Sequence, residues 1–182
     1  TSLYIGFLAG TVGTALGVLI GFLAGYKGGL VDETLRSVID IFLVIPLWPL
    51  LILISAAVRS LTIPLMASLL AAFSWPGSAR EIRAQVMSLK EREFVNIARL
   101  SGLGTFEILF MEIFTNMIPF VAAGFVMSVT GAILAEVALE VIGLGPPQAT
   151  SIGLMLYWAQ QYAATVKGWW WWIIPPILFL VL

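Results

Sequence analysis

Residues 3–26, LYIGFLAGTVGTALGVLIGFLAGY, form a run of 24 residues without a charged side chain. A bilayer core about 30 Å thick requires around 20 apolar residues in a helix that crosses it, so this run is long enough to span a membrane. Of the 182 residues in the chain, 60% are hydrophobic and 10% are charged, against roughly 45–50% apolar and about 25% charged in soluble domains. The composition therefore predicts a membrane protein.

Four further charge-free runs follow, at residues 41–58, 60–79, 113–135 and 168–182. Together the five runs predict an all-α, polytopic membrane protein with five transmembrane helices. The last run has 15 residues, which reach only about 22 Å at 1.5 Å per residue, and the first run begins without a charged leader. We therefore expect residues 1–182 to be a single transmembrane domain from the interior of a longer protein, truncated at both ends.

The positive charges predict the orientation of these spans. Alternate threading places seven of the nine Lys and Arg residues on one side and leaves Arg59 and Lys167 on the other. Because cytoplasmic loops retain Lys and Arg, the side that carries residues 80–107 is predicted to be cytoplasmic. Residues 136–168 then form an outer loop.

The outer loop contains Pro146, Pro147 and a Gly-Leu-Gly sequence at 143–145. Irregular backbone at membrane depth occurs only where it is buried in protein or lines a wet cavity. We therefore expect a loop with a short re-entrant or interfacial helix around residues 151–162, not a plain span. Trp158 and the run 169–172 are expected at the outer headgroup level, which indole rings prefer.

The first run also carries a stripe of glycines at helical spacing. Small residues let helix backbones approach closely, and packing drives helix association in lipid. The stripe therefore predicts a packing face within the subunit or its complex, without direct contact to substrate. It consists of Gly6, Gly10, Gly13, Gly17, Gly21 and Gly25.

Several function classes are excluded by what the sequence lacks. The formal net charge is −1, so no strongly basic field is available for nucleic acid. Cysteine and histidine are absent, which removes disulfides, Cys/His zinc sites and Ser-His or Cys-His catalytic pairs. We expect no catalytic residue, no metal ligand and no nucleic-acid partner.

A few polar residues lie in or beside the fourth span. Polar groups at membrane depth are costly, so they indicate a cavity, a partner or an interface with water. Glu136 follows the span directly, and its alternative interpretation is a hydrogen-bonded or exposed structural carboxylate. The candidates for a translocation pathway or gate are Asn116, Thr130 and Glu136.

Charged residues are densest between the third and fourth spans, at residues 80–107. Apolar residues recur there with helical periodicity, and Gly102 and Gly104 are placed to end the helix. The simplest interpretation is a solvated helix in a cytoplasmic loop.

Three separated blocks of sequence suggest a more specific interpretation. Residues 93–102, EFVNIARLSG, followed by 108–116, ILFMEIFTN, resemble the EAA loop of the inner-membrane permease subunits of ABC importers. Residues 25–40, GYKGGLVDETLRSVID, and 132–147, AILAEVALEVIGLGPP, resemble the C-type permeases of dipeptide and oligopeptide importers. The likeness covers essentially the whole chain. The loop departs from the family pattern, since Asn96 and Ile97 replace the usual Glu and Ala, while Ala98 and Gly102 are retained.

The resemblance implies a non-catalytic, multi-pass permease of the cell (inner) membrane, with six spans in the complete family pattern. Its implied partners are a second homologous permease, membrane lipid, an extracellular substrate-binding protein and two ABC ATPase subunits, which bind ATP and magnesium. The cytoplasmic loop would hold a coupling helix that acts as a lever against the ATPases, pivoting at the two glycines. The coupling residues expected on this basis are Glu93, Phe94, Asn96, Ile97, Ala98, Arg99, Gly102 and Gly104.

The sequence leaves the substrate open. The resemblance implies short peptides, but permeases of the same type import β-linked oligosaccharides such as cello-oligosaccharides, and others carry nickel complexes. An intramembrane enzyme or a channel is a rival from another class. The enzyme would need a nucleophile, acid/base or metal cluster at membrane depth, and without His or Cys only carboxylates, Ser and Thr are available.

Overall fold

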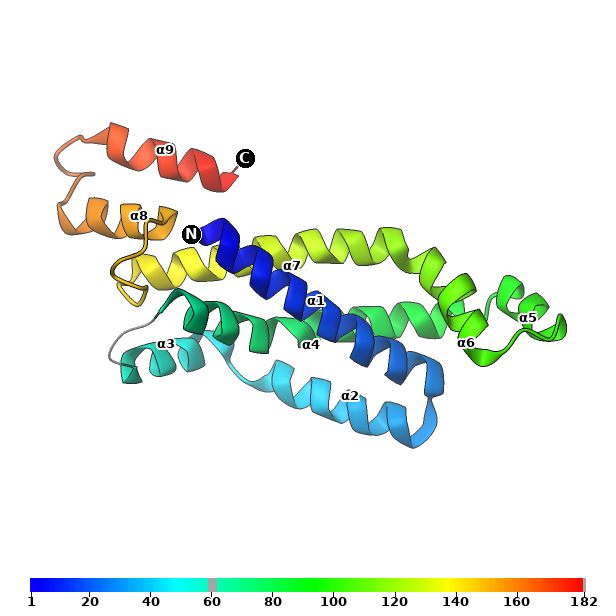
Figure 1. Ribbon diagram of the computed structural model, residues 1–182. Coiled ribbons are helices and arrows are strands. Elements are labelled where there is room, and N and C mark those ends of the chain that lie inside the picture. The colour runs from blue at the N-terminus through cyan, green and yellow to red at the C-terminus, as the bar shows by residue number, and fades with distance from the viewer. Residues whose placement is uncertain (59–61, 182) are drawn as a thin grey trace. The chain divides into compact units, whose positions relative to one another are not determined.

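The computed structural model describes residues 1–58 and 62–181. This part of the chain is helical and contains no strand (Figure 1), which confirms the all-α prediction. Arg59, expected on the outer side, lies outside the described residues. The elements are α1 (Ser2–Lys27), α2 (Gly29–Val44), α3 (Leu47–Ala57), α4 (Ile63–Leu89), α5 (Glu93–Leu100), α6 (Thr105–Glu107), the π-helix η1 (Ile108–Phe114), α7 (Thr115–Val141), α8 (Ile152–Gln161) and α9 (Trp170–Val181).

Within the described residues, two helices are long and apolar enough to cross a membrane. They are α1, with 26 residues, and the continuous helix of 37 residues that α6, η1 and α7 form from Thr105 to Val141. The pair α2 and α3 would make a third span, bent by 69°. The run 41–58 is therefore not one straight helix. The break lies at Ile45, which precedes Pro46 and adopts an extended conformation, as residues before proline tend to do.

Helix α4 joins two segments that the sequence divided at residue 80. It begins in the apolar run 60–79 and continues without a break into the charged segment, ending at Leu89. Ala79, Ile82 and Val86 are all buried, and their spacing of three and four residues places them on one face of the helix. The charged side chains lie between them, so the apolar stripe carries the helix past the boundary that the charges suggested.

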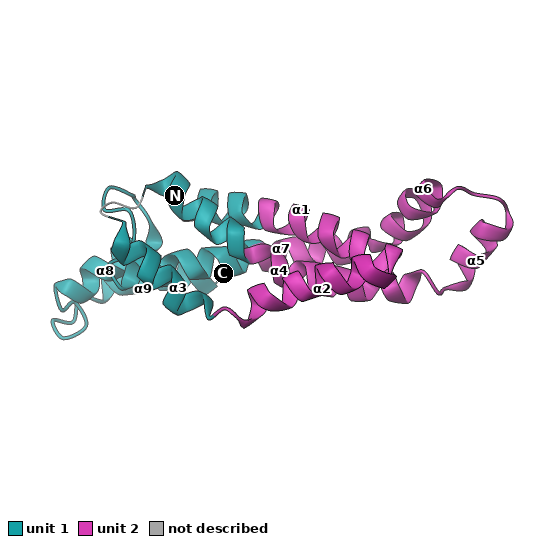
Figure 2. Ribbon diagram, turned by 90° about the horizontal axis from the view of Figure 1, so that it is seen from below, with its two compact units in different colours: residues 1–10, 46–73, 129–182 teal, residues 11–45, 74–128 magenta. Residues whose placement is uncertain are grey.

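The described chain divides into two compact units (Figure 2). Unit 1 comprises residues 1–10, 46–73 and 129–182, and unit 2 comprises residues 11–45 and 74–128. The core of unit 1 gathers apolar side chains from four helices. They are Ile5 and Ala9 of α1, Leu51 of α3, Met66, Ala67, Leu70 and Ala71 of α4, and Ala132 and Leu139 of α7.

The main core of unit 2 joins α4, α5, the π-helix and α7. It consists of Ile82, Val86, Val95, Ala98, Ile108, Ile113 and Met117, with Val18, Phe22 and Tyr26 of α1 packed against it. A smaller cluster holds Ile39, Trp75 and Ala79, where Phe42 of α2 meets Trp75 edge-on at a centroid distance of 5.1 Å. The short helix α5 is thus anchored by side chains that it contributes to a shared core.

The glycine stripe of α1 is a packing face, as predicted. In unit 1, a Cβ added to Gly10 would lie 2.8 Å from Cα of Val129 in α7. In unit 2, a Cβ added to Gly21 would lie 2.6 Å from the backbone oxygen of Ala79 in α4. Contacts this close leave no room for a side chain. Gly6 also faces α7, and Gly13, Gly17 and Gly25 also face α4.

Helices α8 and α9 of unit 1 carry an aromatic cluster. The helix expected around residues 151–162 corresponds to α8, whose N-cap, Ser151, accepts a hydrogen bond from the Leu154 N–H at 3.3 Å. Tyr162 stacks on Trp172 at a centroid distance of 5.7 Å, and the Lys167 ammonium lies 4.7 Å from the ring centroid of Trp169. The Tyr162–Trp172 contact joins the C-terminal end of α8 to α9.

Substitution of Gly21 by alanine tests the packing face. The added methyl group meets the backbone of α4, and overpacking of this kind costs about 1–3 kcal/mol. Gly21→Ala should therefore lower the thermal unfolding temperature of the detergent-purified permease. Gly131→Ala is the matched control, because a Cβ at Gly131 meets nothing within 4 Å. Equal unfolding temperatures for the two variants would contradict a close α1–α4 contact.

Candidate coupling site

Helix α5 has one buried face and one exposed apolar face. Val95 is 0% exposed and Ala98 is 5% exposed, and both belong to the core of unit 2. On the other side, Ile97 is 62% exposed and Leu100 is 89% exposed. One face of the helix is therefore packed against the core of unit 2, and the other face exposes apolar side chains.

The C-terminal end of α5 is defined by local backbone geometry. After Leu100 the N–H of Leu103 bonds to the oxygen of Ala98 at 3.2 Å, and that of Gly102 bonds to the oxygen of Arg99 at 3.1 Å. This pair of bonds is a Schellman motif, which requires a left-handed residue at its turn. Gly102 supplies it with φ of 82°. The prediction that the helix ends at this glycine is confirmed.

Gly104 has an ordinary extended conformation and serves a different purpose. Its N–H donates to Oε2 of Glu107 at 2.8 Å, and it directly precedes the first residue of α6. The connection between α5 and the long helix is therefore a short turn that is hydrogen-bonded on both sides.

The long helix contains a π-helical segment directly after α6. It covers Ile108–Phe114, and single π turns within α-helices are frequent at functional sites. Ile108 and Ile113 are buried in the core of unit 2. The hydroxyl of Thr115 donates to the oxygen of Phe110, five residues back, at 3.2 Å. The winding of the long helix therefore differs over this segment, which is nevertheless packed into the core.

The structure places the predicted coupling residues in different environments. Glu93, Asn96 and Arg99 are exposed, Phe94 is half-buried, and Ala98 is buried. Glu93 lies in the first turn and Arg99 in the last turn of α5, so each charge complements the helix dipole.

Sequence reasoning missed part of the exposed apolar surface around α5. Leu100, Leu103 and Phe106 are exposed by 89%, 37% and 76%. The periodic pattern includes Leu100 among the apolar residues of the helix, but it does not indicate whether Leu100 faces the core or the solvent. Only the burial of Val95 and Ala98 fixes the orientation of the helix and shows that Leu100 points outward. We call Ile97, Leu100, Leu103 and Phe106 the apolar coupling surface.

Ion pairs and a lysine contact fix the helices around α5. Asp32 of α2 accepts two hydrogen bonds from Arg83 of α4, at 2.5 Å from Nε to Oδ1 and 2.6 Å from Nη2 to Oδ2. These bonds hold the pKa of the Asp32 carboxyl below its usual value, against the opposing effect of burial. Lys90, just after α4, donates from Nζ to the backbone oxygen of Gly25 in α1 at 3.1 Å. Three helices are thereby tied together next to the core that holds α5.

The pathway candidates do not share one environment. Asn116, in unit 2, is exposed and donates from Nδ2 to the oxygen of Glu112 at 2.6 Å. Thr130, in unit 1, is exposed as well. Glu136, also in unit 1, is 0% exposed. A pathway role for Glu136 would therefore require unit 1 to open.

Glu136 has a neighbour that the sequence did not single out for a role. Glu140, one turn further along α7, is also 0% exposed, and within the described residues none of the four carboxylate oxygens has a hydrogen-bond partner. Gly153 packs directly on Glu140, since a Cβ there would lie 2.5 Å from Oε2 of Glu140. The contact with α8 could not be inferred from the sequence, because it joins residues separated by a turn and an irregular segment.

Comparison with known proteins connects this geometry to a family. Residues 17–182 match the family model described as "Binding-protein-dependent transport system inner membrane component". The chain is 33% identical over 183 residues to the oligopeptide transport system permease protein OppC of Mycobacterium tuberculosis, covering 100% of this chain and 62% of that protein. It is 30% identical over 147 residues to the dipeptide transport system permease protein DppC of Bacillus subtilis, covering 79% of this chain and 45% of that protein.

A third relative, the dipeptide transport system permease protein DppC of Haemophilus influenzae, is 29% identical over 185 residues, covering 100% of this chain and 61% of that protein. The chain thus spans less than two thirds of the length of these relatives. The similarity nevertheless includes the two spans, α5 and the π-helix.

Loss of the Asp32 carboxylate should destabilise unit 2. Asp32→Asn leaves Arg83, whose side chain is only 18% exposed, without its counter-charge, and an unsatisfied group of this kind costs about 1–3 kcal/mol. Thermal unfolding of the purified permease near neutral pH measures the loss. Glu33→Gln is the control, since Glu33 is exposed and should leave the unfolding temperature unchanged.

The pH dependence of this difference follows from the lowered pKa of Asp32. The stabilisation is complete above the ordinary aspartate pKa of about 3.9. It is lost as the pH falls below that value toward the lower pKa of the folded state. The difference in unfolding temperature between wild type and Asp32→Asn should therefore persist down to mildly acidic pH and disappear only at lower pH. If this difference disappeared near neutral pH, that result would contradict a stabilising ion pair between Asp32 and Arg83.

Proposed function

Because the chain belongs to the family of inner membrane components of binding-protein-dependent transport systems, we propose that it is the C-type permease subunit of an ABC importer for short peptides. Members of this family are transport permeases of the membrane and not enzymes. In the proposed assembly the chain forms half of the translocation pathway with a second permease. Two ATPases bind at the cytoplasmic side, and an extracellular binding protein delivers the substrate.

The observation that carries this proposal is the apolar coupling surface on and after α5. Exposed apolar side chains in water are unfavourable by roughly 25 cal/mol per Å², so a surface of this kind favours a protein partner. Val95 and Ala98 anchor the helix to the core shared by α4 and α7. A force applied to Ile97 and Leu100 would therefore reach the membrane helices.

The proposed mechanism treats α5 as a rigid lever. When the ATPases close, α5 moves with them, and the turn at Gly102 and Gly104 takes up part of the rotation. The π-helical segment Ile108–Phe114 takes up the remainder, because its winding differs from that of the α-helix on either side. Glu93 and Arg99 are exposed and would form charge pairs with the ATPase groove.

The topology proposed for this machine keeps the five spans and their orientation. Residues 80–107, from the middle of α4 to the end of α6, lie at the cytoplasmic side as the coupling loop. Residues 136–168, with α8, form the outer loop. The charge distribution supports this arrangement, since seven of the nine cationic residues fall on the side of α5 and cytoplasmic loops retain such residues.

Short peptides are the proposed substrate, since the relatives are named as oligopeptide and dipeptide permeases. The oligosaccharide alternative rests only on permeases of the same type and has no specific observation in its favour. In unit 1, Trp172 stacks on both Trp169 and Tyr162, so these three rings already make contacts within the protein.

The variant Leu100→Asp should impair the coupling between the ATPases and transport. A charge at the centre of the apolar coupling surface weakens docking of the ATPase, while the fold is spared because the side chain is 89% exposed. We expect substrate-stimulated ATP hydrolysis and uptake in proteoliposomes to fall at least tenfold, equivalent to about 1.4 kcal/mol of lost docking. Ala98, which also belongs to the predicted set, is less suitable because its substitution would disrupt the core as well.

The control for this experiment is Leu30→Asp. Leu30 is also an exposed leucine, 79% exposed at the start of α2, and lies outside the coupling surface. Uptake by this variant should match that of wild type. Normal uptake with Leu100→Asp, or equal loss in both variants, would contradict the proposed function.

The substrate class is tested through the extracellular binding protein of the same importer. Calorimetric titration with di- to pentapeptides should show saturable binding. Cello-oligosaccharides of similar length should show none. The reverse result would replace peptides by oligosaccharides while leaving the coupling mechanism intact.

A further inference from the structure

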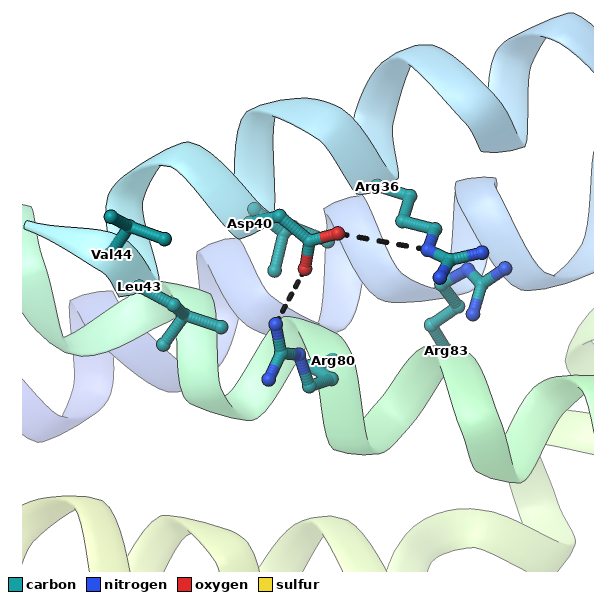
Figure 3. A pocket seen from close by; sticks show the side chains of 7 residues that line it. Arg36, Asp40, Leu43, Val44, Arg80 and Arg83 are labelled. Atoms are coloured by element: carbon teal, nitrogen blue, oxygen red, sulfur yellow. Dashed lines mark hydrogen bonds and ion pairs between the residues drawn. The ribbon is translucent and has the colours of Figure 1, made fainter.

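A pocket with a volume of about 670 Å³ lies in unit 2 between α2 and α4 (Figure 3). Its residues divide into a charged group and an apolar group. The proposed coupling mechanism uses neither group. The lining consists of Arg36, Ile39, Asp40, Leu43 and Val44 of α2 and of Arg80 and Arg83 of α4.

The charged part of the pocket has an excess of positive charge. Asp40 is shared by two arginines, with Oδ1 2.5 Å from Nη2 of Arg80 and Oδ2 3.6 Å from Nε of Arg36, as the dashed lines in Figure 3 show. Arg83 is held by Asp32, which is not part of the lining. Three guanidinium groups thus face two carboxylates, which leaves one net positive charge.

Hydrogen-bond donors are also in excess. Each guanidinium carries five N–H donors, and the contacts above use one nitrogen each of Arg36 and Arg80 and two of Arg83. The side chains of Arg36 and Arg80 are 65% and 57% exposed. Their remaining donors are therefore accessible to a ligand.

The apolar part of the pocket continues along α2. Ile39, Leu43 and Val44 follow Arg36 over two turns, about 12 Å at 1.5 Å per residue. Val44 is 82% exposed and Leu43 is 40% exposed. The run of apolar residues that begins at Ile41 is the one expected within the membrane. The charges therefore lie on the solvent side of the apolar wall.

We propose that this pocket binds the phosphate headgroup of an anionic phospholipid, with the start of an acyl chain against Leu43 and Val44. Guanidinium forks match the geometry of phosphate oxygens, and the adjoining apolar wall fits an amphiphile better than a free anion. Basic pockets between helices at a membrane surface take up anionic headgroups in this way. The site depends on the chain being in a membrane and not on peptide transport or on α5.

Native mass spectrometry of the full permease complex in detergent tests this site. The complex is titrated separately with phosphatidylglycerol and with phosphatidylcholine of the same chain length. Wild type should bind phosphatidylglycerol at least several-fold more tightly. The variant Arg36→Gln/Arg80→Gln should lose about fivefold in affinity for each arginine removed. Lys27→Gln, which removes an exposed cation outside the pocket, should behave as wild type.

A second variant distinguishes loss of lipid binding from loss of the fold. Arg36→Gln alone removes a solvent-exposed ion pair of 3.6 Å, and exposed pairs contribute little to stability. The complex should therefore assemble normally and still bind phosphatidylglycerol about fivefold less tightly. Wild-type ATPase activity in this variant would separate the lipid site from the proposed coupling function.

Two results would overturn the proposal. Equal binding of the two lipids by wild type, or equal loss in Arg36→Gln and Lys27→Gln, would show that the pocket does not select an anionic headgroup. Displacement of phosphatidylglycerol by inorganic phosphate at millimolar concentration would identify a free-anion site instead of a lipid site. Failure of inorganic phosphate to compete, with selective loss in Arg36→Gln, supports the lipid.

Discussion

The close approach of the α1 and α4 backbones is the constraint on which unit 2 depends. Lipid offers no hydrophobic driving force between helices, so association relies on van der Waals packing. Glycines at Gly13, Gly17, Gly21 and Gly25 bring α1 against α4. This contact fixes the face of α4 that carries Ile82 and Val86, and those two side chains hold α5 through Val95 and Ala98.

Electrostatics reinforces the same end of unit 2. Asp32 and Asp40 on α2 pair with Arg83 and Arg80 on α4, so ion pairs join the same two helices that share the cluster of Ile39, Trp75 and Ala79. The Asp32 pair is largely shielded from solvent and orients both helices, whereas the Asp40 pair is open to solvent. One set of charges therefore stabilises the fold, and the other remains available for binding.

The sequence predicted the features that depend on local pattern. The uncharged run 3–26 forms α1, and Gly102 ends α5 because a left-handed turn favours glycine.

The sequence did not predict that α4 runs past residue 80, since the charges there obscured the buried stripe of Ala79, Ile82 and Val86. The π-helix has no sequence signature of its own. The burial of Glu140 depends on packing by Gly153, which lies beyond an irregular segment. The coupling surface likewise required knowledge of which face α5 buries.

In the proposed coupling mechanism, the arrangement of α5 would let a small helix transmit a large motion. A helix that buried all its apolar residues would offer a partner nothing to bind, and one that exposed them all would turn freely on its connections. Val95 and Ala98 fill the core, while Ile97 and Leu100 stay in water. In the proposed mechanism, the free energy of docking would be gained on the exposed face and resisted on the buried face, so α5 would transfer force to α4 and to the π-helical start of the long helix instead of rotating in place.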